Sequence, residues 1–169
     1  MKRIPPSTQM REAIMSQLAA RPSGVPVGPA PPLRAFVARA AERAYAMAGV
    51  EDPGEEIDLA EVDDVYAFKE LQHLEALGLG TAGELAEMLA EGELEADGDL
   101  PVNVSGGSLG QGNLFEANGL VRLLECVEQL RGEAGERQVE EAYVALAQSW
   151  RGVPATSAAV VVVGSEEGT

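Results

Sequence analysis

Residues 101–130 read PVNVSGGSLGQGNLFEANGLVRLLECVEQL, and this stretch decides the fold. Residues 101–105 form a short β-prone run that enters a glycine-rich loop at 106–112. Glycines let the backbone approach another group closely, so such a loop often borders a ligand. Apolar residues then recur at helical spacing over 117–130, forming one stripe at Leu120, Leu124, Val127 and Leu130. The stretch therefore predicts a strand, a loop and a helix in that order.

The residues before this stretch predict an alternation of helices and strands. An Ala-rich run at 34–48 favours a helix, and Gly49 suits the left-handed residue that follows a last helical turn. Residues 57–62 alternate apolar and polar side chains over the length of one short strand. Helical spacing returns at 65–77 and again at 82–89.

Two further strands are expected near the end of the chain, at 139–147 and at 158–163. The second is continuously apolar, as expected for a strand that is covered on both faces. Alternating strands and helices of this kind favour an α/β fold with a layered αβα arrangement. We expect a mixed, mostly parallel sheet of about four strands.

Composition sets the expected organisation. Residues 1–33 hold a possible helix at 7–20 and a Pro-rich segment at 21–33, which together predict an arm and a linker. A domain at 34–164 and a flexible tail at 165–169 complete the expected division. Alternatively, the chain is an excised or truncated domain, and residues 1–33 are then an interdomain leader.

The formal charge of −16 argues against binding to nucleic acid or to an anionic membrane surface, since both depend on clustered Lys and Arg. The single cysteine, Cys126, cannot form an internal disulfide, and no apolar run is long enough for a membrane span. We therefore expect a cytoplasmic protein. The spacing around His73 suggests no metal site, and a surface or hydrogen-bonded histidine is the favoured interpretation.

Four stretches carry a family resemblance: AAERAYAMAG at 40–49, EVDDVY at 61–66, LPVNVSGG at 100–107 and QLRGEAG at 129–135. In order and spacing they resemble the C-terminal half of the thiolase superfamily. The resemblance is strongest to the sterol-carrier-type and acetyl-CoA acetyltransferase-like branch. It covers about residues 34–164 and implies half of a thiolase fold.

The resemblance also implies Claisen-type acyl-CoA chemistry, in which a cysteine of the N-terminal half takes the acyl group. This chain has no counterpart of that half, and Cys126 lies inside a Leu-rich helix, where a buried thiol is favoured. Asn113 stands where the family places its catalytic histidine. An amide can donate a hydrogen bond to an enolate oxygen but cannot exchange a proton near neutral pH. The aligned position of the family's second reactive cysteine, within 148–157, holds no thiol.

Three further residues are candidate catalytic groups. Glu116 is either a general base in a dry pocket or a helix N-terminal acid favoured by the helix dipole. Tyr66 and Asp63 fall where the family places an Asn or His at a strand end, and the adjacent Asp64 either joins them or caps the next helix. We expect the substrate-binding residues to be Asn103, Gly106, Gly107 and Gly112.

These features predict a subunit of a split or heteromeric thiolase-like enzyme that performs acyl transfer, or C–C bond cleavage or formation, on an acyl-CoA. The partner is expected to be a thiolase N-terminal-like subunit or another thiolase-family chain, with homo-oligomers forming in its absence. The chain itself is expected to bind no cofactor, with a coenzyme A thioester as the substrate. The alternative is a catalytically degenerate scaffold or regulatory subunit.

Overall fold

A computed structural model describes residues 32–150 and 157–165. The expected helix at 7–20, most of the Pro-rich linker and nearly all of the C-terminal tail lie outside the described residues. Helix α2 begins at Pro32, slightly before the predicted start, and the last strand ends at Gly164.

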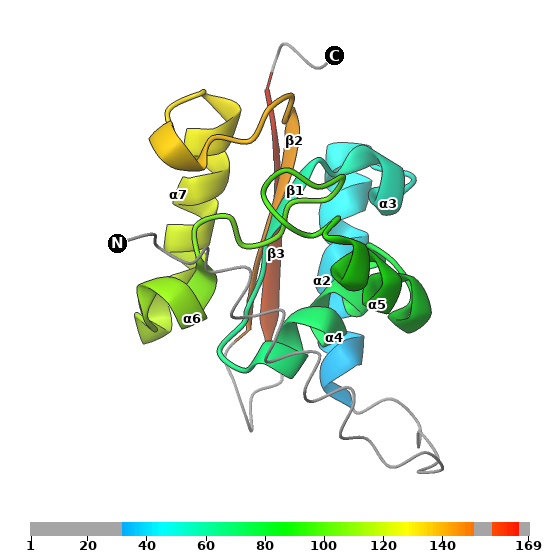
Figure 1. Ribbon diagram of the computed structural model, residues 1–169. Coiled ribbons are helices and arrows are strands. Elements are labelled where there is room, and N and C mark those ends of the chain that lie inside the picture. Colours follow the sequence, from blue (N-terminus) through cyan, green and yellow to red (C-terminus); the bar gives the residue numbers. More distant parts are fainter. Residues whose placement is uncertain (1–31, 151–156, 166–169) are drawn as a thin grey trace.

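The described chain forms three layers, with the sheet between two groups of helices (Figure 1). Helices α2 (Pro32–Ala48), α3 (Pro53–Glu56), α4 (Ala67–Leu77) and α5 (Ala82–Glu91) lie on one side. Helices α6 (Gly107–Gln111) and α7 (Asn118–Leu130) lie on the other. The predicted α/β class and αβα layering are confirmed.

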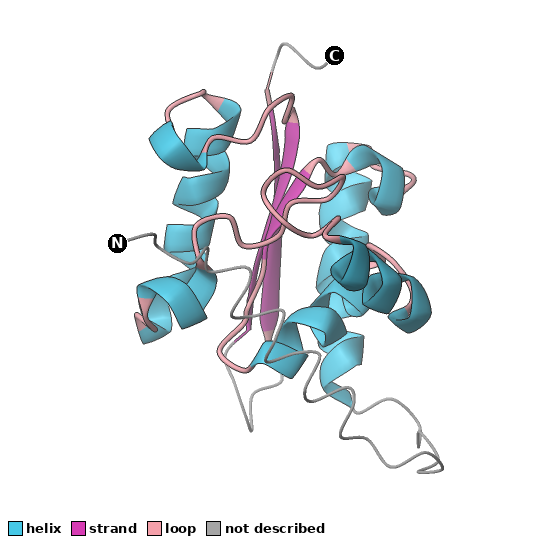
Figure 2. Ribbon diagram, in the orientation of Figure 1, coloured by secondary structure: helices cyan, strands magenta, loops and turns pink. Residues whose placement is uncertain are grey.

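The sheet has the order β1-β2-β3, formed by Leu59–Glu61, Val144–Trp150 and Ala158–Gly164 (Figure 2). Strand β1 pairs in parallel with β2, and β2 pairs in antiparallel fashion with β3. The sheet is mixed, as predicted, but within the described residues it has three strands rather than about four, and one parallel and one antiparallel pairing rather than a mostly parallel arrangement. The expected strand at 101–105 makes only a parallel bridge between Val102 and Ala60, because Asn103 turns into the left-handed region with φ of 52°.

Two other strand predictions need correction. Strand β2 begins at Val144 rather than at 139, since Glu141 has φ of 56° and the Asp58 carboxylate accepts hydrogen bonds from the Tyr143 and Val144 amides. Strand β3 is not covered on both faces. It lies at the sheet edge, and its side chains alternate between half-buried and exposed, with Val161 39% exposed.

Local signals predict the helices well. Helix α2 is followed by Gly49 with φ of +80°, as its sequence suggests. Helix α5 begins with a capping box in which Thr81 and Glu84 bond reciprocally. The predicted glycine loop, however, contains a short helix, α6, between Gly106 and Gly112.

The core is unequal on the two faces of the sheet. A large apolar cluster fills the space between the sheet and helices α2, α4 and α5. Beneath α7 the buried apolar cluster is small and consists of Leu59, Cys126, Ala145 and Ala147. Helix α7 therefore depends on polar contacts for much of its attachment.

Helix α7 turns a polar face inward. Its buried residues are mostly polar or charged, namely Asn118, Arg122, Glu125, Cys126 and Gln129. Leu120 and Leu124, from the apolar stripe noted in the sequence, are instead 71% and 55% exposed. A helix of a free-standing domain normally presents its apolar stripe to its own core. The outer face of α7 is thus an apolar surface that this chain's described residues leave uncovered.

Candidate active site

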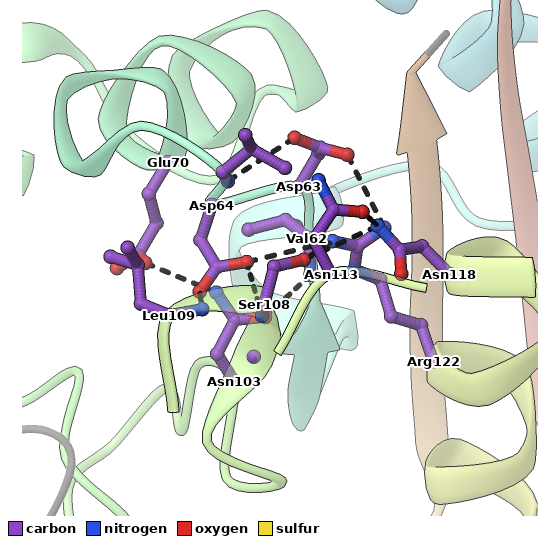
Figure 3. A network of polar contacts seen from close by, with 12 residues as sticks. Val62, Asp63, Asp64, Glu70, Asn103, Ser108, Leu109, Asn113, Asn118 and Arg122 are labelled. Atoms are coloured by element: carbon purple, nitrogen blue, oxygen red, sulfur yellow. Dashed lines mark hydrogen bonds and ion pairs between the residues drawn. The ribbon is translucent and has the colours of Figure 1, made fainter. Parts of the chain in front are cut away.

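The candidate site lies where the end of β1 meets the loop before α6 and the start of α7 (Figure 3). A small pocket, partly open to solvent, is found here. It is lined by Ser105, Gly107, Ser108, Gln111, Gly112, Leu114, Asn118, Val121 and Arg122. Two of the predicted substrate-binding residues, Gly107 and Gly112, are among them.

The loop before α6 is shaped by three residues with positive φ. Asn103, Gly106 and Gly107 have φ of 52°, 96° and 57°. A Cβ on Gly107 would overlap the carboxylate of Asp64, so only glycine fits between that side chain and the pocket. Gly107 thus allows the loop to close over a buried acid.

Asp64 is fully buried and ties this loop to β1. Its two carboxylate oxygens accept hydrogen bonds from the amides of Ser108 at 2.7 Å and Leu109 at 3.1 Å. Both amides belong to the first turn of α6, where free backbone donors favour a negative charge. Asp64 therefore caps α6, which is distant in sequence, rather than the next helix, α4.

Arg122 is the cation at the centre of the site, and sequence reasoning did not identify it. Its side chain is only 3% exposed, and its Nη2 donates to Ser108 Oγ at 2.8 Å. Its guanidinium lies 3.4 Å from Asp63 Oδ2 and 3.5 Å from Asp64 Oδ1. Arg122 Nε and Nη1 have no hydrogen-bond partner among the described residues.

Asp63, a predicted catalytic residue, lies behind the pocket and contacts it through Arg122. Its amide donates to Gln148 Oε1 at 2.8 Å, which joins the end of β1 to β2. Burial raises the pKa of Asp63, although the neighbouring Arg122 opposes this shift.

Asn113 is exposed at the pocket rim, held by Asn118. Asn113 Oδ1 accepts a hydrogen bond from Asn118 Nδ2 at 2.7 Å and another from the Phe115 amide at 2.8 Å. Asn118 Oδ1 in turn accepts from the Leu114 amide. With its oxygen occupied, Asn113 retains its Nδ2 group as the hydrogen-bond donor that an incoming oxygen atom could use.

Asn103 has protein partners for both ends of its amide. Its Oδ1 accepts from the Val62 amide at 2.8 Å, and its Nδ2 donates to Glu70 Oε2 at 3.1 Å. Asn103 is buried and does not line the pocket. Burial raises the pKa of Glu70 to about 8, with the charge of Asp64 adding to the effect.

Glu61 is a second fully buried acid close to the loop. Its carboxylate accepts hydrogen bonds from the amide and the hydroxyl of Ser105, at 3.0 and 2.6 Å. Burial raises the pKa of Glu61 to about 7, even though both hydrogen bonds lower it. Period-two alternation places this side chain on the same face as Ile57 and Leu59, but sequence reasoning did not single it out.

Tyr66 and Glu116 stand apart from the pocket lining. Tyr66 precedes α4, is 56% exposed, and stacks on Phe68 with ring centroids 5.8 Å apart. Glu116 is exposed within the short 3-10 helix η1 (Phe115–Ala117). Both face solvent in this chain, and neither lines the pocket.

Two reactive residue types are buried away from the pocket. Cys126 is fully buried on the inner face of α7, and burial raises the pKa of its thiol. His73 is 5% exposed against Trp150, its Nε2 has no partner among the described residues, and burial lowers its pKa to about 3. It is therefore buried rather than at the surface, which corrects the first of the two environments that the sequence favoured.

Other properties of the described residues bear on the class of protein. They contain no cluster of three or more His, Cys, Asp or Glu side chains that could hold a metal ion. None of the described helices is long and apolar enough to cross a membrane.

Comparisons with known proteins agree with this architecture. Over 119 residues the chain is 40% identical to an acetyl-CoA acetyltransferase of Methanothermobacter thermautotrophicus, an alignment that covers 70% of this chain and 30% of that protein. It is 39% identical over 107 residues to human sterol carrier protein 2, covering 63% of this chain and 19% of that protein. The alignments with these relatives span about a third of their length or less.

Among solved structures, the chain resembles one named Ltp2-ChsH2(DUF35) aldolase, with a TM-score of 0.66 and 28% identity. The match covers 77% of this chain and 32% of that chain. A family model described as thiolase C-terminal domain-like matches residues 31–165. With that model matching most of its length, and with thiolase-like relatives and fold, the chain belongs to the thiolase C-terminal domain-like family.

Proposed function

We propose that this chain is a subunit of a split or heteromeric thiolase-like enzyme and supplies one wall of an acyl-CoA site. A partner chain supplies the nucleophilic cysteine and most of the coenzyme A cradle. The reaction is acyl transfer, or C–C bond cleavage or formation, on an acyl-CoA of lipid metabolism. The observation that carries the proposal is the inverted helix α7, whose buried face is polar and whose exposed face is apolar.

The exposed apolar side chains continue beyond α7. Leu109 on α6, Leu114 after it and Phe115 on η1 are 50%, 58% and 82% exposed. Together with Leu120 and Leu124 they form what we call the α7 face. Large exposed apolar patches are uncommon on monomers, and we infer that these side chains mark an interaction site. Because Leu114 also lines the pocket, a molecule that covers the α7 face would also close the site.

Within this site, the proposed role of Asn113 is to donate its Nδ2 hydrogen to the thioester or enolate oxygen. Gly107 and Gly112 let the protein backbone approach the substrate at the pocket wall. Asn103 and Gly106 shape the loop that carries these glycines. Glu116 and Tyr66 act from the rim, where the partner encloses them. Asp63 orients Arg122 from behind the pocket at 3.4 Å.

Two findings support a partnered enzyme, one on a structural neighbour and one on this chain. The structural neighbour bears a name that joins Ltp2 to ChsH2(DUF35) and calls the assembly an aldolase. The buried Cys126 is an unsuitable nucleophile, because the reactive form of a thiol is the exposed or activated thiolate. The nucleophile of the proposed reaction is therefore assigned to another chain.

Affinity purification of the tagged chain from its source organism tests the proposal. The expected result is a stoichiometric thiolase-like partner that carries a reactive cysteine. Leu120→Asp should abolish this association, whereas Met47→Asp should preserve it, since Met47 is 89% exposed on α2, across the sheet. Association that survives Leu120→Asp, or a monodisperse monomer in light scattering of the isolated chain, would count against the proposal.

The second candidate function is a catalytically degenerate scaffold or regulatory subunit. It is favoured by the internal pairing of Arg122 with Asp63 and Asp64, and by the occupied oxygen of Asn113. Asn113→Ala, Glu116→Gln and Tyr66→Phe, each measured in the reconstituted complex, separate the two functions. A scaffold predicts unchanged turnover in all three variants, whereas the enzyme predicts a loss at Asn113 at least.

A further inference from the structure

The Ser105 hydroxyl connects the pocket to the buried carboxyl of Glu61. Ser105 lines the pocket, while Glu61 lies behind it with no exposed surface. Both carboxylate oxygens of Glu61 meet Ser105, one through the amide at 3.0 Å and the other through the hydroxyl at 2.6 Å. The short hydroxyl contact has the length of a charge-assisted hydrogen bond. A proton on Ser105 Oγ is thus within direct reach of Glu61 Oε2.

The surroundings of Glu61 bring its pKa close to neutrality, so both the protonated and the ionised forms are populated there. The ionisable groups that interact with it are Arg122, Glu125 and Cys126 on α7, Glu70 on α4 and Arg137 after α7. Burial is the largest influence and raises the pKa of Glu61 to about 7. Glu125 adds to this rise, whereas Ser105 and Arg122 oppose it. Glu61 can therefore both accept and release a proton near neutral pH.

The other side chains that line the pocket cannot do so. Its remaining lining residues are glycines, apolar side chains, amides, one more hydroxyl and the guanidinium of Arg122. An arginine stays protonated in proteins, and amides do not exchange protons near neutrality. Asn113 at the rim has the same limitation. Proton exchange in the pocket therefore needs a group behind the lining.

We propose that Glu61 and Ser105 form a proton relay that serves this pocket. A hydroxyl, thiol or water bound against Ser105 Oγ gives its proton to that oxygen as the Ser105 proton passes to Glu61 Oε2. The electron pair of the broken bond stays on the bound molecule, and the reverse transfer returns the proton. Ser105 touches the bound molecule, and Glu61 acts through it. Only the identity of the bound molecule, the thiol of coenzyme A or the enol of an acyl-CoA, rests on the proposed function.

Infrared spectroscopy of the isolated chain tests the coupling. Glu70→Gln provides the background, because it removes the other buried glutamate whose pKa lies near neutrality. In this background we expect a protonated-carboxyl band that disappears with a midpoint near pH 7. Adding Glu61→Gln should remove the band. Adding Ser105→Ala should move the midpoint up by about one pH unit or more, because it deletes a hydrogen bond to the charged form.

Ser105→Thr keeps the hydroxyl and should restore the original midpoint, and far-UV circular dichroism of each variant confirms that it is folded. Should Glu61→Gln fail to fold, the comparison of Ser105→Ala with Ser105→Thr still decides. A band that persists without Glu61, or a midpoint that ignores the Ser105 hydroxyl, overturns the relay.

The reconstituted complex supplies the second arm, with acetyl-CoA as the probe. In the wild-type complex, turnover should change with pH around a midpoint near pH 7. This limb of the pH profile should be absent in Ser105→Ala and present again in Ser105→Thr. An unchanged limb in Ser105→Ala overturns the relay and leaves the proposed function standing. Absence of any turnover in the wild-type complex counts against the proposed function, and the infrared titration alone then decides the relay.

Discussion

Replacing Gly107 by alanine should destabilise the chain far more than the backbone strain of the substitution accounts for. The new Cβ would overlap the Asp64 carboxylate, which must then leave the amides of Ser108 and Leu109. Each hydrogen bond to a charged group contributes about 1.5–3 kcal/mol, so we expect a loss of about 3–6 kcal/mol beyond strain. The left-handed conformation itself costs an alanine about 1–2 kcal/mol.

Gly132→Ala is the matched control, because Gly132 also has positive φ, at 67° against 57° for Gly107, and a Cβ there meets nothing within 4 Å. The measurement is urea unfolding of the isolated chain followed by circular dichroism, with free energies of unfolding compared at equal slope. Gly132→Ala should show the strain alone. Equal destabilisation by the two substitutions would refute the argument that position 107 must be glycine to leave room for the Asp64 carboxylate.

Three further predictions concern buried ionisable groups. Arg122→Leu should cost about 3–5 kcal/mol at pH 7 in urea unfolding, because it leaves Asp63 buried without its cation, and the cost should shrink as acid protonates Asp63; a cost independent of pH would contradict this. Because burial raises the folded-state pKa of Glu61 to about 7 and of Glu70 to about 8, from 4.5, both groups bind protons more tightly in the folded state. The free energy of unfolding should therefore fall as pH rises from about 4.5 to 8, by up to about 1.4 kcal/mol per pH unit for each of the two groups. Glu70→Gln should make this pH dependence less steep. An unchanged slope in the variant would contradict the assignment. Cys126 should stay unreactive toward a thiol reagent until urea unfolds the chain, since it is fully buried with a raised pKa, and rapid reaction in the folded chain would show otherwise.

Local signals made several elements predictable from the sequence. Gly49 ends α2 because glycine adopts a left-handed φ without help from distant residues. The bounds of α4 and α5 were likewise predicted to within a few residues. The family resemblance, which rests on short stretches in a fixed order, identified the family, and the alternation of strands and helices predicted the layering. These features depend on residues that are neighbours in the chain.

The features that could not be predicted from the sequence depend on contacts between residues that are distant in the chain. Helical spacing groups Leu120 and Leu124 on one face, but it does not say whether that face meets the chain's own sheet or another molecule. The pairing of Arg122 with Asp63 joins residues of α7 and β1, and no local pattern distinguishes this arginine from a surface one. Arg122 is nevertheless spaced four residues from Asn118, and the polar stripe that both form with Glu125 and Gln129 at helical spacing was the available signal.

Strand ends were misplaced for a similar reason. Residues 139–143 have strand-like composition, yet the Asp58 carboxylate, which is distant in sequence, binds the amide of Tyr143. Asn103 looks like an interior strand residue, and only its bonds to Val62 and Glu70 show why it turns. In both cases a side chain competes with the backbone ladder for hydrogen bonds.

Whether a second molecule covers the α7 face can be measured by hydroxyl-radical footprinting of the native complex against the isolated chain. Oxidation of Phe115, Leu120 and Leu124 should fall sharply in the complex, while oxidation of the exposed Met47 on α2 should stay the same. Equal oxidation of the α7 face in both samples would contradict the account that this chain contributes one wall of a shared site.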